Sequence, residues 1–283
     1  MQLIRPTQQV KNGAVLLGAL ASGNVSNSSE LLKVLILILA WVGLSGFIYI
    51  FNDLTDINLD KLHPEKSKRP IASGKINPVL ARFVAIPTII LSILLFGFFG
   101  YKLFFIAISY LVINLSYSLY LKNIVVIELL LVSSGFVLRG LSGILVVNAI
   151  PSVWFVLLSL FGSLLLVAGK RSAQRIETKM ISGSNRKVVN SYSETFLLQL
   201  QIICTTGLLI SYVLMTQERA IDNDFQRIFL YASIIPFITT VLYINYFQDK
   251  EPESELTRLL LARKPLAIST IVWFITFSVS VVA

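Results

Sequence analysis

Long apolar runs separated by short polar segments dominate this chain. A helix that crosses a bilayer needs about 20 predominantly apolar residues, and nine runs approach or reach that length. The predicted spans are residues 12–24, 31–51, 79–99, 103–119, 124–146, 151–169, 195–215, 228–247 and 265–283. The pattern predicts an all-α integral membrane protein with about nine transmembrane helices, built as a single polytopic domain over residues 1–283.

The distribution of basic residues predicts the orientation of these spans. Of the 24 Lys and Arg residues, 18 lie in segments 1–11, 52–78, 120–123, 170–194 and 248–264. The opposite side carries four, namely Lys33, Lys102, Arg219 and Arg227. Because basic loops stay in the cytoplasm, the first set is predicted to be cytoplasmic. If the first run were re-entrant, the N-terminus would lie outside, but the long loops would remain inside.

Two of the cytoplasmic loops, 52–78 and 170–194, are long, whereas connections within a helical bundle are usually short. They follow the second and the sixth predicted spans. This spacing indicates an internal repeat of four-helix units and favours one shared site between the two loops.

Composition narrows the class of function. The chain is 55% hydrophobic and 14% charged, with a net charge of +9. In a membrane protein such a basic excess reflects topology, so no nucleic-acid partner is predicted. The single cysteine, Cys204, excludes an intrachain disulfide. The single histidine, His63, lies in a polar loop, where solvation is more common than chemistry.

Four oxygen-bearing side chains open the first long loop: Asn52, Asp53, Asp56 and Asp60. If the second span continues as a helix through them, Asn52, Asp56 and Asp60 share one face with Asp53 beside them. Stacked carboxylates repel one another, and a divalent cation removes that cost. Oxygen-only ligands favour Mg²⁺, with Mn²⁺ also possible. The alternative is a solvated helix end, although the helix dipole disfavours acidic groups there.

Basic residues follow this acidic segment. Lys66 and Arg69 are predicted to contact phosphate, whereas Lys61 and Lys75 are interpreted as ordinary cytoplasmic charge. The second long loop, 170–194, contains no aspartate and has a net charge of +4. Such a loop would attract phosphate rather than hold a second metal.

Two charges lie inside the predicted fifth span. Glu128 and Arg139 are eleven residues apart, about three helical turns, and therefore share a face without pairing directly. Charges inside a membrane usually face a cavity or a partner. Arg139 is therefore predicted to meet either a lipid phosphate or a polar group of a neighbouring helix.

At residues 52–60 the sequence matches every fixed position of N-D-x-x-D-x-x-x-D, the first motif of the UbiA superfamily of intramembrane prenyltransferases, which it resembles. The resemblance implies an all-α bundle with a cavity open laterally to lipid. Ordinary members carry a second aspartate-rich motif, which is missing here. That departure resembles the decaprenyl-phosphate phosphoribosyltransferase branch. Further matches to that branch are R-P-x-Q-x-V-K-N at 5–12, H-P-x-K-x-x-R-P-I-A-x-G at 63–74, Y-S-x-x-L-K at 117–122, G-K-R-x-A at 169–173 and P-E at 252–253.

The resemblance implies transfer of 5-phosphoribose from 5-phosphoribosyl 1-diphosphate to a polyprenyl phosphate, with release of diphosphate. Asp53, Asp56 and Asn52 would hold Mg²⁺, and Asp60 would act through water or orient the ribose. Expected substrate contacts are Lys11, Asn52, Lys66, Arg69, Lys122, Arg139, Lys170, Arg171 and Tyr192. The expected stereochemistry is inversion at C1, because the lipid phosphate attacks opposite the leaving diphosphate.

The resemblance also places the protein in a bacterial plasma membrane, with a cytoplasmic active site and a product that feeds arabinofuranose-containing envelope glycans such as arabinogalactan. It makes no prediction of oligomeric state. Two other functions stay open. One is prenyl transfer from an isoprenoid diphosphate to an aromatic or other acceptor. The other is a transporter or lipid flippase, which would not account for carboxylates at the membrane surface.

Overall fold

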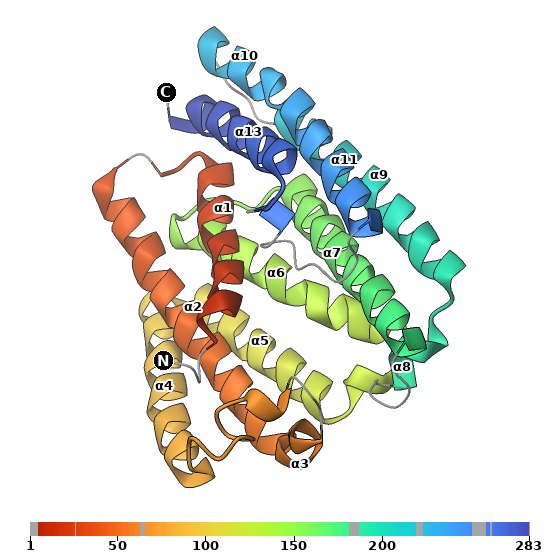
Figure 1. Cartoon of the computed structure of the whole chain (residues 1–283). Helices are drawn as coiled ribbons and strands as arrows, with labels where there is room; N and C mark the ends of the chain where they lie inside the picture. The colour runs from red at the N-terminus through yellow and green to blue at the C-terminus, as the bar shows by residue number, and fades with distance from the viewer. Residues whose placement is uncertain are drawn as a thin grey trace. The chain divides into compact units, whose positions relative to one another are not determined.

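A computed structural model describes residues 5–25, 27–62, 66–180, 187–218, 223–250, 259–260 and 262–282. The described residues form helices and no strands (Figure 1). The α-helices are α1 (Gly13–Ser22), α2 (Ser28–Thr55), α3 (Ile57–Lys61), α4 (Pro78–Phe98), α5 (Tyr101–Leu119), α6 (Ile127–Val146), α7 (Val153–Met180), α8 (Lys187–Ser191), α9 (Glu194–Glu218), α10 (Asp224–Ala232), α11 (Ile234–Lys250) and α13 (Lys264–Val282). Short 3₁₀ helices are η2 (Pro6–Asn12), η3 (Lys66–Lys68) and η4 (Leu121–Asn123).

Eight helical segments in the described part of the chain are long and apolar enough to cross a membrane. They are α2, α4, α5, α6, the first 24 residues of α7, α9, the α10–α11 pair and α13 up to Val281. The all-α membrane fold is confirmed, but the count of nine is only approximate. The first predicted span, 12–24, forms α1, whose 10 residues extend about 15 Å and fall short of a bilayer core.

The chain forms two compact units. Unit 1 comprises Met1–Lys122 and Leu138–Ile150, and unit 2 comprises Asn123–Val137 and Pro151–Ala283. Helix α6 therefore contributes its first half to unit 2 and its second half to unit 1. The acidic segment at residues 52–60 belongs entirely to unit 1, so its geometry can be described within that unit.

Close backbone contact sets the position of α1 in unit 1. A Cβ atom built on Gly18 would collide with the backbone of Gly140, and one built on Gly143 would collide with the backbone of Val15. Small residues at such crossings let membrane helices approach closely and gain van der Waals contact. These glycines seat α1 on the second half of α6 and thereby fix where η2, directly before α1, lies.

The core of unit 1 gathers around Trp41 of α2. Its ring meets Phe96 and Tyr110 edge-on, with centroids 5.3 Å and 4.9 Å away, and its Nε1 donates to Ser142 Oγ at 2.8 Å. Edge-to-face pairs of this kind stabilise beyond simple burial. The contacts join the middle of α2 to α4, α5 and α6.

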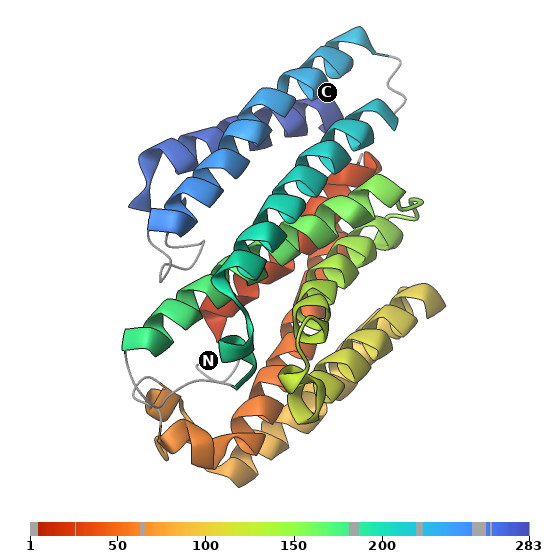
Figure 2. The same ribbon diagram turned by 90° about the vertical axis from the view of Figure 1, so that its right-hand side faces the viewer.

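Unit 2 is built around the pair α7 and α9, which run alongside each other (Figures 1 and 2). A Cβ on Gly207 of α9 would lie 2.7 Å from the Phe161 ring of α7, so a larger residue there would displace the ring. Another group of contacts in unit 2 centres on Tyr212. Its ring stacks on Phe237 with centroids 3.9 Å apart, and its hydroxyl accepts a hydrogen bond from Trp273 Nε1 at 2.9 Å. These contacts connect α9, α11 and α13.

Candidate functional site

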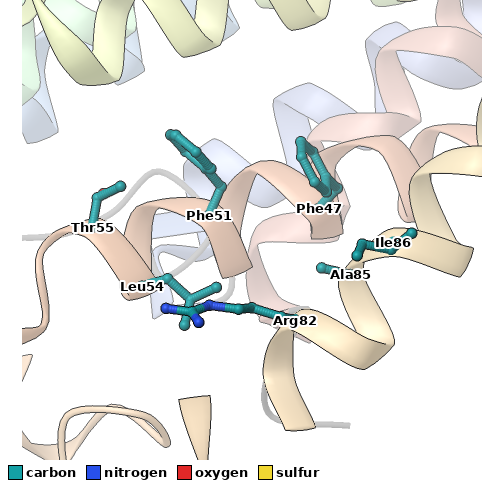
Figure 3. A pocket seen from close by; sticks show the side chains of 7 residues that line it. All are labelled: Phe47, Phe51, Leu54, Thr55, Arg82, Ala85 and Ile86. Carbon is teal, nitrogen blue, oxygen red and sulfur yellow. The ribbon is translucent and has the colours of Figure 1, made fainter. Parts of the chain in front are cut away.

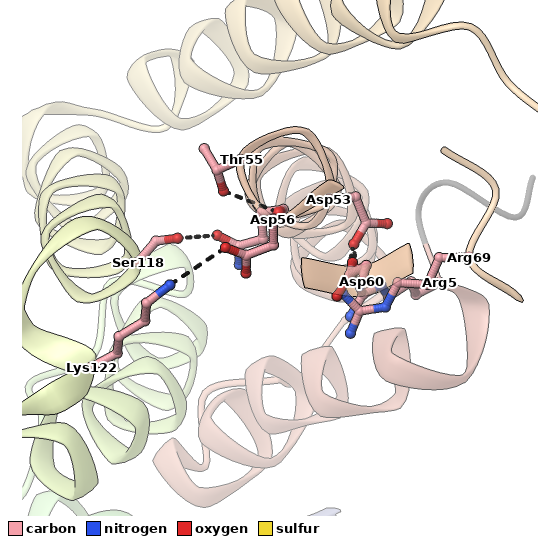
Figure 4. A network of polar contacts seen from close by, with 9 residues as sticks. Arg5, Asp53, Thr55, Asp56, Asp60, Arg69, Ser118 and Lys122 are labelled. Atoms are coloured by element: carbon pink, nitrogen blue, oxygen red, sulfur yellow. Dashed lines mark hydrogen bonds and ion pairs between the residues drawn. The ribbon is translucent and has the colours of Figure 1, made fainter. Parts of the chain in front are cut away.

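The acidic segment does not continue as one straight helix. Helix α2 ends at Thr55, Asp56 adopts φ −99° and ψ 13°, and α3 starts at Ile57. The predicted single face of Asn52, Asp56 and Asp60 is therefore not found. The four side chains divide into two pairs with different partners, and Figure 4 shows the three carboxylates among them. The basic partners offset the repulsion between like charges in this segment.

The first pair is Asp53 and Asp60, which share one guanidinium. Arg69 Nη1 lies 2.6 Å from Asp60 Oδ2 and 3.2 Å from Asp53 Oδ1. Arg5 also donates to Asp53 Oδ1 through Nη2, and its guanidinium lies 5.3 Å from the Tyr49 ring centre. The carboxylates are buried, with side chains 2% and 4% exposed, while Arg5 and Arg69 are about a quarter exposed. The cations therefore stand between the buried carboxylates and solvent.

The second pair is Asn52 and Asp56. Ser118 Oγ of α5 donates to Asn52 Oδ1 at 2.6 Å, and Lys122 Nζ of η4 lies 3.5 Å from Asp56 Oδ1. The Asp56 side chain is 24% exposed. We call these four residues and the basic partners Arg5, Arg69 and Lys122 the acidic cluster.

The acidic cluster has the donor chemistry of a magnesium site but not its geometry. All four donors are oxygens, as Mg²⁺ prefers. Within the described residues, however, no three Asp, Glu, His or Cys side chains converge as a ligand set. Asp53 and Asp60 come closest to a shared ligand set, because both carboxylates contact the Arg69 guanidinium. A hard divalent ion therefore fits the residue types, and Arg5, Arg69 and Lys122 contact some of the oxygens that would hold it.

Sequence reasoning missed Arg5 as a member of this site. It begins the R-P-x-Q-x-V-K-N segment, which was the only signal available for it. The segment is anchored to unit 1 by polar contacts. Ser45 Oγ donates to Gln9 Oε1 at 3.0 Å, and Arg139 Nε donates to Asn12 Oδ1 at 2.7 Å. These anchors hold η2 where Arg5 can reach Asp53.

Arg139, predicted to meet either a phosphate or a neighbouring helix, has neighbouring-helix partners in the structure. Its side chain is buried and also donates from Nη2 to Tyr110 OH at 3.0 Å. Its guanidinium lies 4.9 Å from the Trp41 ring centre, a favourable cation–π distance. The described contacts give Arg139 a place in the core of unit 1.

Unit 2 holds a second carboxylate–guanidinium pair, which we call the Glu128 cluster: Glu128, Arg171 and Tyr192. Arg171 binds the carboxylate with two donors, Nε to Oε1 at 2.8 Å and Nη2 to Oε2 at 2.6 Å. Tyr192 OH donates to Glu128 Oε1 at 3.3 Å and accepts from the Val126 N–H at 3.0 Å. Val126 has a positive φ of 68°, so this hydrogen bond secures a strained residue just before α6.

Burial raises the pKa of the Tyr192 hydroxyl above its ordinary value, and the neighbouring Glu128 carboxylate adds to the effect. The hydrogen bond from Val126 opposes it. Tyr192 therefore stays protonated as a donor to Glu128. Two residues predicted as substrate contacts, Arg171 and Tyr192, thus have partners within the protein.

The remaining predicted contacts are placed as follows. Lys11 lies in η2 and Lys66 begins η3, both in unit 1 and both partly buried. Lys170 is exposed in the second half of α7, in unit 2. His63 and the Pro252–Glu253 pair lie outside the described residues.

Comparisons with known proteins agree with this architecture. A model of the UbiA prenyltransferase family matches residues 13–216. The chain is 30% identical to the decaprenyl-phosphate phosphoribosyltransferase of Mycobacterium tuberculosis (strain CDC 1551 / Oshkosh) over 285 residues, 99% of this chain and 93% of that relative. It is also 30% identical to the enzyme of the same name from Corynebacterium glutamicum, over 96% of this chain and 83% of the relative.

The fold has a solved counterpart. A UbiA homolog from Archaeoglobus fulgidus bound to GPP and Mg²⁺ matches with a TM-score of 0.73 at 16% identity, covering 99% of this chain and 96% of that chain. The match of fold, family model and near full-length relatives leads to one conclusion: the chain belongs to the UbiA prenyltransferase family of membrane transferases.

Proposed function

We propose that this protein transfers 5-phosphoribose from 5-phosphoribosyl 1-diphosphate to a polyprenyl phosphate and releases diphosphate. The observation that carries the proposal is the acidic cluster, in which every carboxylate is paired with a basic side chain. The near full-length similarity to decaprenyl-phosphate phosphoribosyltransferases supports the choice of substrates.

The pairing supports the binding of a metal–diphosphate complex by exchange of partners. Such a complex carries its own cation for the carboxylates and its own anionic oxygens for the guanidinium and ammonium groups. Arg5, Arg69 and Lys122 would then move their donors from carboxylate to phosphate, which keeps all charges matched. Since both arginines are about a quarter exposed, their donors can turn outward without leaving a buried cation uncompensated.

In this proposal the residues that hold Mg²⁺ are Asn52, Asp53, Asp56 and Asp60. Bound there, the metal would supply charge neutralisation for the departing diphosphate. The archaeal UbiA homolog bound to Mg²⁺ supports a metal in this fold, and Mn²⁺ has the same oxygen preference.

The basic side chains provide the rest of the transition-state stabilisation. Lys66, Arg69, Arg5 and Lys122 would hold the leaving diphosphate while positive charge develops at C1 of the ribose. The lipid phosphate is already ionised at neutral pH, so attack from the opposite face needs no strong base and inverts C1. Lys11 and Lys170 are proposed to contact the remaining phosphates.

Arg139, Arg171 and Tyr192 receive a different role from the one expected of them. Their buried partners Asn12, Tyr110 and Glu128 support a positioning function. We assign them to holding η2 and the segment before α6 in place rather than to direct phosphate contact.

The site is proposed to face the cytoplasm of a bacterial plasma membrane. The excess of Lys and Arg in the loops that carry it supports this orientation. Phosphoribosyl diphosphate is a soluble, highly charged molecule, so the face that binds it must be open to water.

A transfer assay tests the proposal. Detergent-purified protein is incubated with radiolabelled phosphoribosyl diphosphate and a polyprenyl phosphate, with Mg²⁺ or with EDTA. Label is expected in the organic phase only when Mg²⁺ is present. If folded protein transfers nothing to several polyprenyl phosphates, and instead consumes an isoprenoid diphosphate, prenyl transfer would replace this proposal.

A further inference from the structure

A groove on unit 1 lies apart from the acidic cluster. It measures about 350 Å³ and is formed by one face of α2 and one face of α4 (Figure 3). Its lining residues are Phe47, Phe51, Leu54, Thr55, Arg82, Ala85 and Ile86. None of the carboxylates of the acidic cluster lines it.

The groove has an apolar wall and one charged side chain among its lining residues. Phe47 and Phe51 stack with centroids 6.3 Å apart and form the aromatic side of the wall. Arg82 is the only charged lining residue, and its side chain extends from α4 towards Leu54 of α2 (Figure 3). With the residues the structure describes, Arg82 makes no hydrogen bond or ion pair. The groove therefore presents a cation to whatever fills it.

Arg82 lies near the start of a helix that can span the membrane, where lipid headgroups are expected. Arg82 is four residues after Pro78, the first residue of α4, and thus about 6 Å along the helix axis. Around it, α4 exposes apolar side chains such as Phe83, Ile86 and Ile90, which suit contact with acyl chains. Both α2 and α4 are long and apolar enough to span the membrane.

We propose that this groove binds an anionic phospholipid of the bilayer, with the phosphate on Arg82 and one acyl chain along Phe47 and Phe51. Basic pockets between membrane helices recognise anionic headgroups in this way. An acyl chain gains no hydrophobic free energy when it moves from bulk lipid onto the Phe47 and Phe51 rings, since lipid tails are equally apolar. Selectivity between anionic and zwitterionic lipids therefore comes from Arg82, and the wall supplies shape.

The ligand is assigned to membrane lipid rather than to the transfer substrates because the groove uses another face of α2. Leu54 and Thr55 line the groove, whereas Asp53 and Asp56, on either side of them in sequence, contact Arg5, Arg69 and Lys122. The inference is independent of the proposed function, since lipid binding can be measured without turnover.

Native mass spectrometry of the detergent-purified chain tests it. Retention of dioleoyl phosphatidylglycerol is compared with dioleoyl phosphatidylcholine in the wild type, in Arg82→Gln and in the charge-matched control Lys75→Gln. Lys75 is exposed in the preceding loop and does not line the groove. We expect the wild type to prefer phosphatidylglycerol and Arg82→Gln to bind it about fivefold more weakly, with Lys75→Gln unchanged.

A second pair of variants tests the shape of the site. Ile86→Trp fills the groove from its exposed side, while Ile90→Trp makes the same change at an exposed position of α4 outside the lining. Only Ile86→Trp should lower phosphatidylglycerol retention. Equal binding of both lipids by the wild type, equal losses in Arg82→Gln and Lys75→Gln, or equal losses in the two tryptophan variants would overturn the proposal. Arg82-dependent displacement of phosphatidylglycerol by equimolar polyprenyl phosphate would also overturn it and assign the groove to the acceptor.

Discussion

The two carboxylate–guanidinium arrangements in this protein differ in how completely they are shielded from solvent. The Glu128 cluster is closed to solvent, and the acidic cluster is open to it. In the Glu128 cluster one carboxylate takes two donors from Arg171, and the side chains are 0% and 6% exposed. In the acidic cluster Arg69 is shared between two carboxylates, and the basic side chains are 22–26% exposed. The closed pair suits a permanent structural role. The open one suits an exchange of partners, since its cations can reach water or substrate.

The largest expected effect lies in the closed cluster. Glu128→Gln leaves the buried Arg171 without its full counter-charge, and breaking such a pair costs about 3–5 kcal/mol of folding stability. Denaturant or thermal unfolding in detergent measures it. The double variant Glu128→Met/Arg171→Met removes both charges and should recover most of the loss. A single variant as stable as wild type would contradict the structural role.

The acidic cluster should respond in activity instead. Asp56→Asn is expected to lower transfer about 100- to 1,000-fold, the usual loss when one electrostatic contact to the transition state is removed. Its unfolding should be nearly unchanged, because Asp56 is partly exposed and its pairing with Lys122 is long. Asp224→Asn serves as the matched control, since that carboxylate is 79% exposed in unit 2 and should leave activity unaltered.

Variants of Arg5 test whether a basic side chain of the acidic cluster takes part in transfer. Arg5→Gln is expected to reduce transfer about 10- to 100-fold, the range for loss of a charge-assisted hydrogen bond, while Arg5→Lys retains part of the activity. Steady-state kinetics with varied phosphoribosyl diphosphate measures both variants. Lys75→Gln provides the control for general surface charge. Wild-type kinetics in Arg5→Gln would limit Arg5 to a structural contact with Asp53.

The smallest expected effect concerns Tyr192. Tyr192→Phe removes the hydroxyl that accepts from Val126 and donates to Glu128, a loss of about 1 kcal/mol in stability. Because the folded protein raises the pKa of Tyr192, its contribution is present below the ordinary value of about 10. It is lost as pH rises above that value, when the unfolded chain ionises first. The stability gap between wild type and variant should therefore narrow above pH ~10, and a constant gap would contradict this account.

Much of the fold follows from hydropathy because long apolar runs leave few alternatives to membrane helices. The exception is α1, which is too short to span a bilayer. Its position is explained by small residues that let it pack closely on α6. The acidic motif was recognisable from spacing alone. The bend at Asp56 and the pairing of Arg5 with Asp53, 48 residues apart, were not. Such contacts depend on tertiary structure, which leaves no recognisable pattern in the local sequence.

Equilibrium binding of labelled phosphoribosyl diphosphate to the wild type and to Asp56→Asn, each with Mg²⁺ and with EDTA, tests the exchange of partners most directly. We expect Mg²⁺ to tighten binding at least tenfold in the wild type and to have little effect in Asp56→Asn. Metal-independent binding in the wild type, or an equal effect of Mg²⁺ in both proteins, would contradict the assignment of the acidic cluster as the metal–diphosphate site.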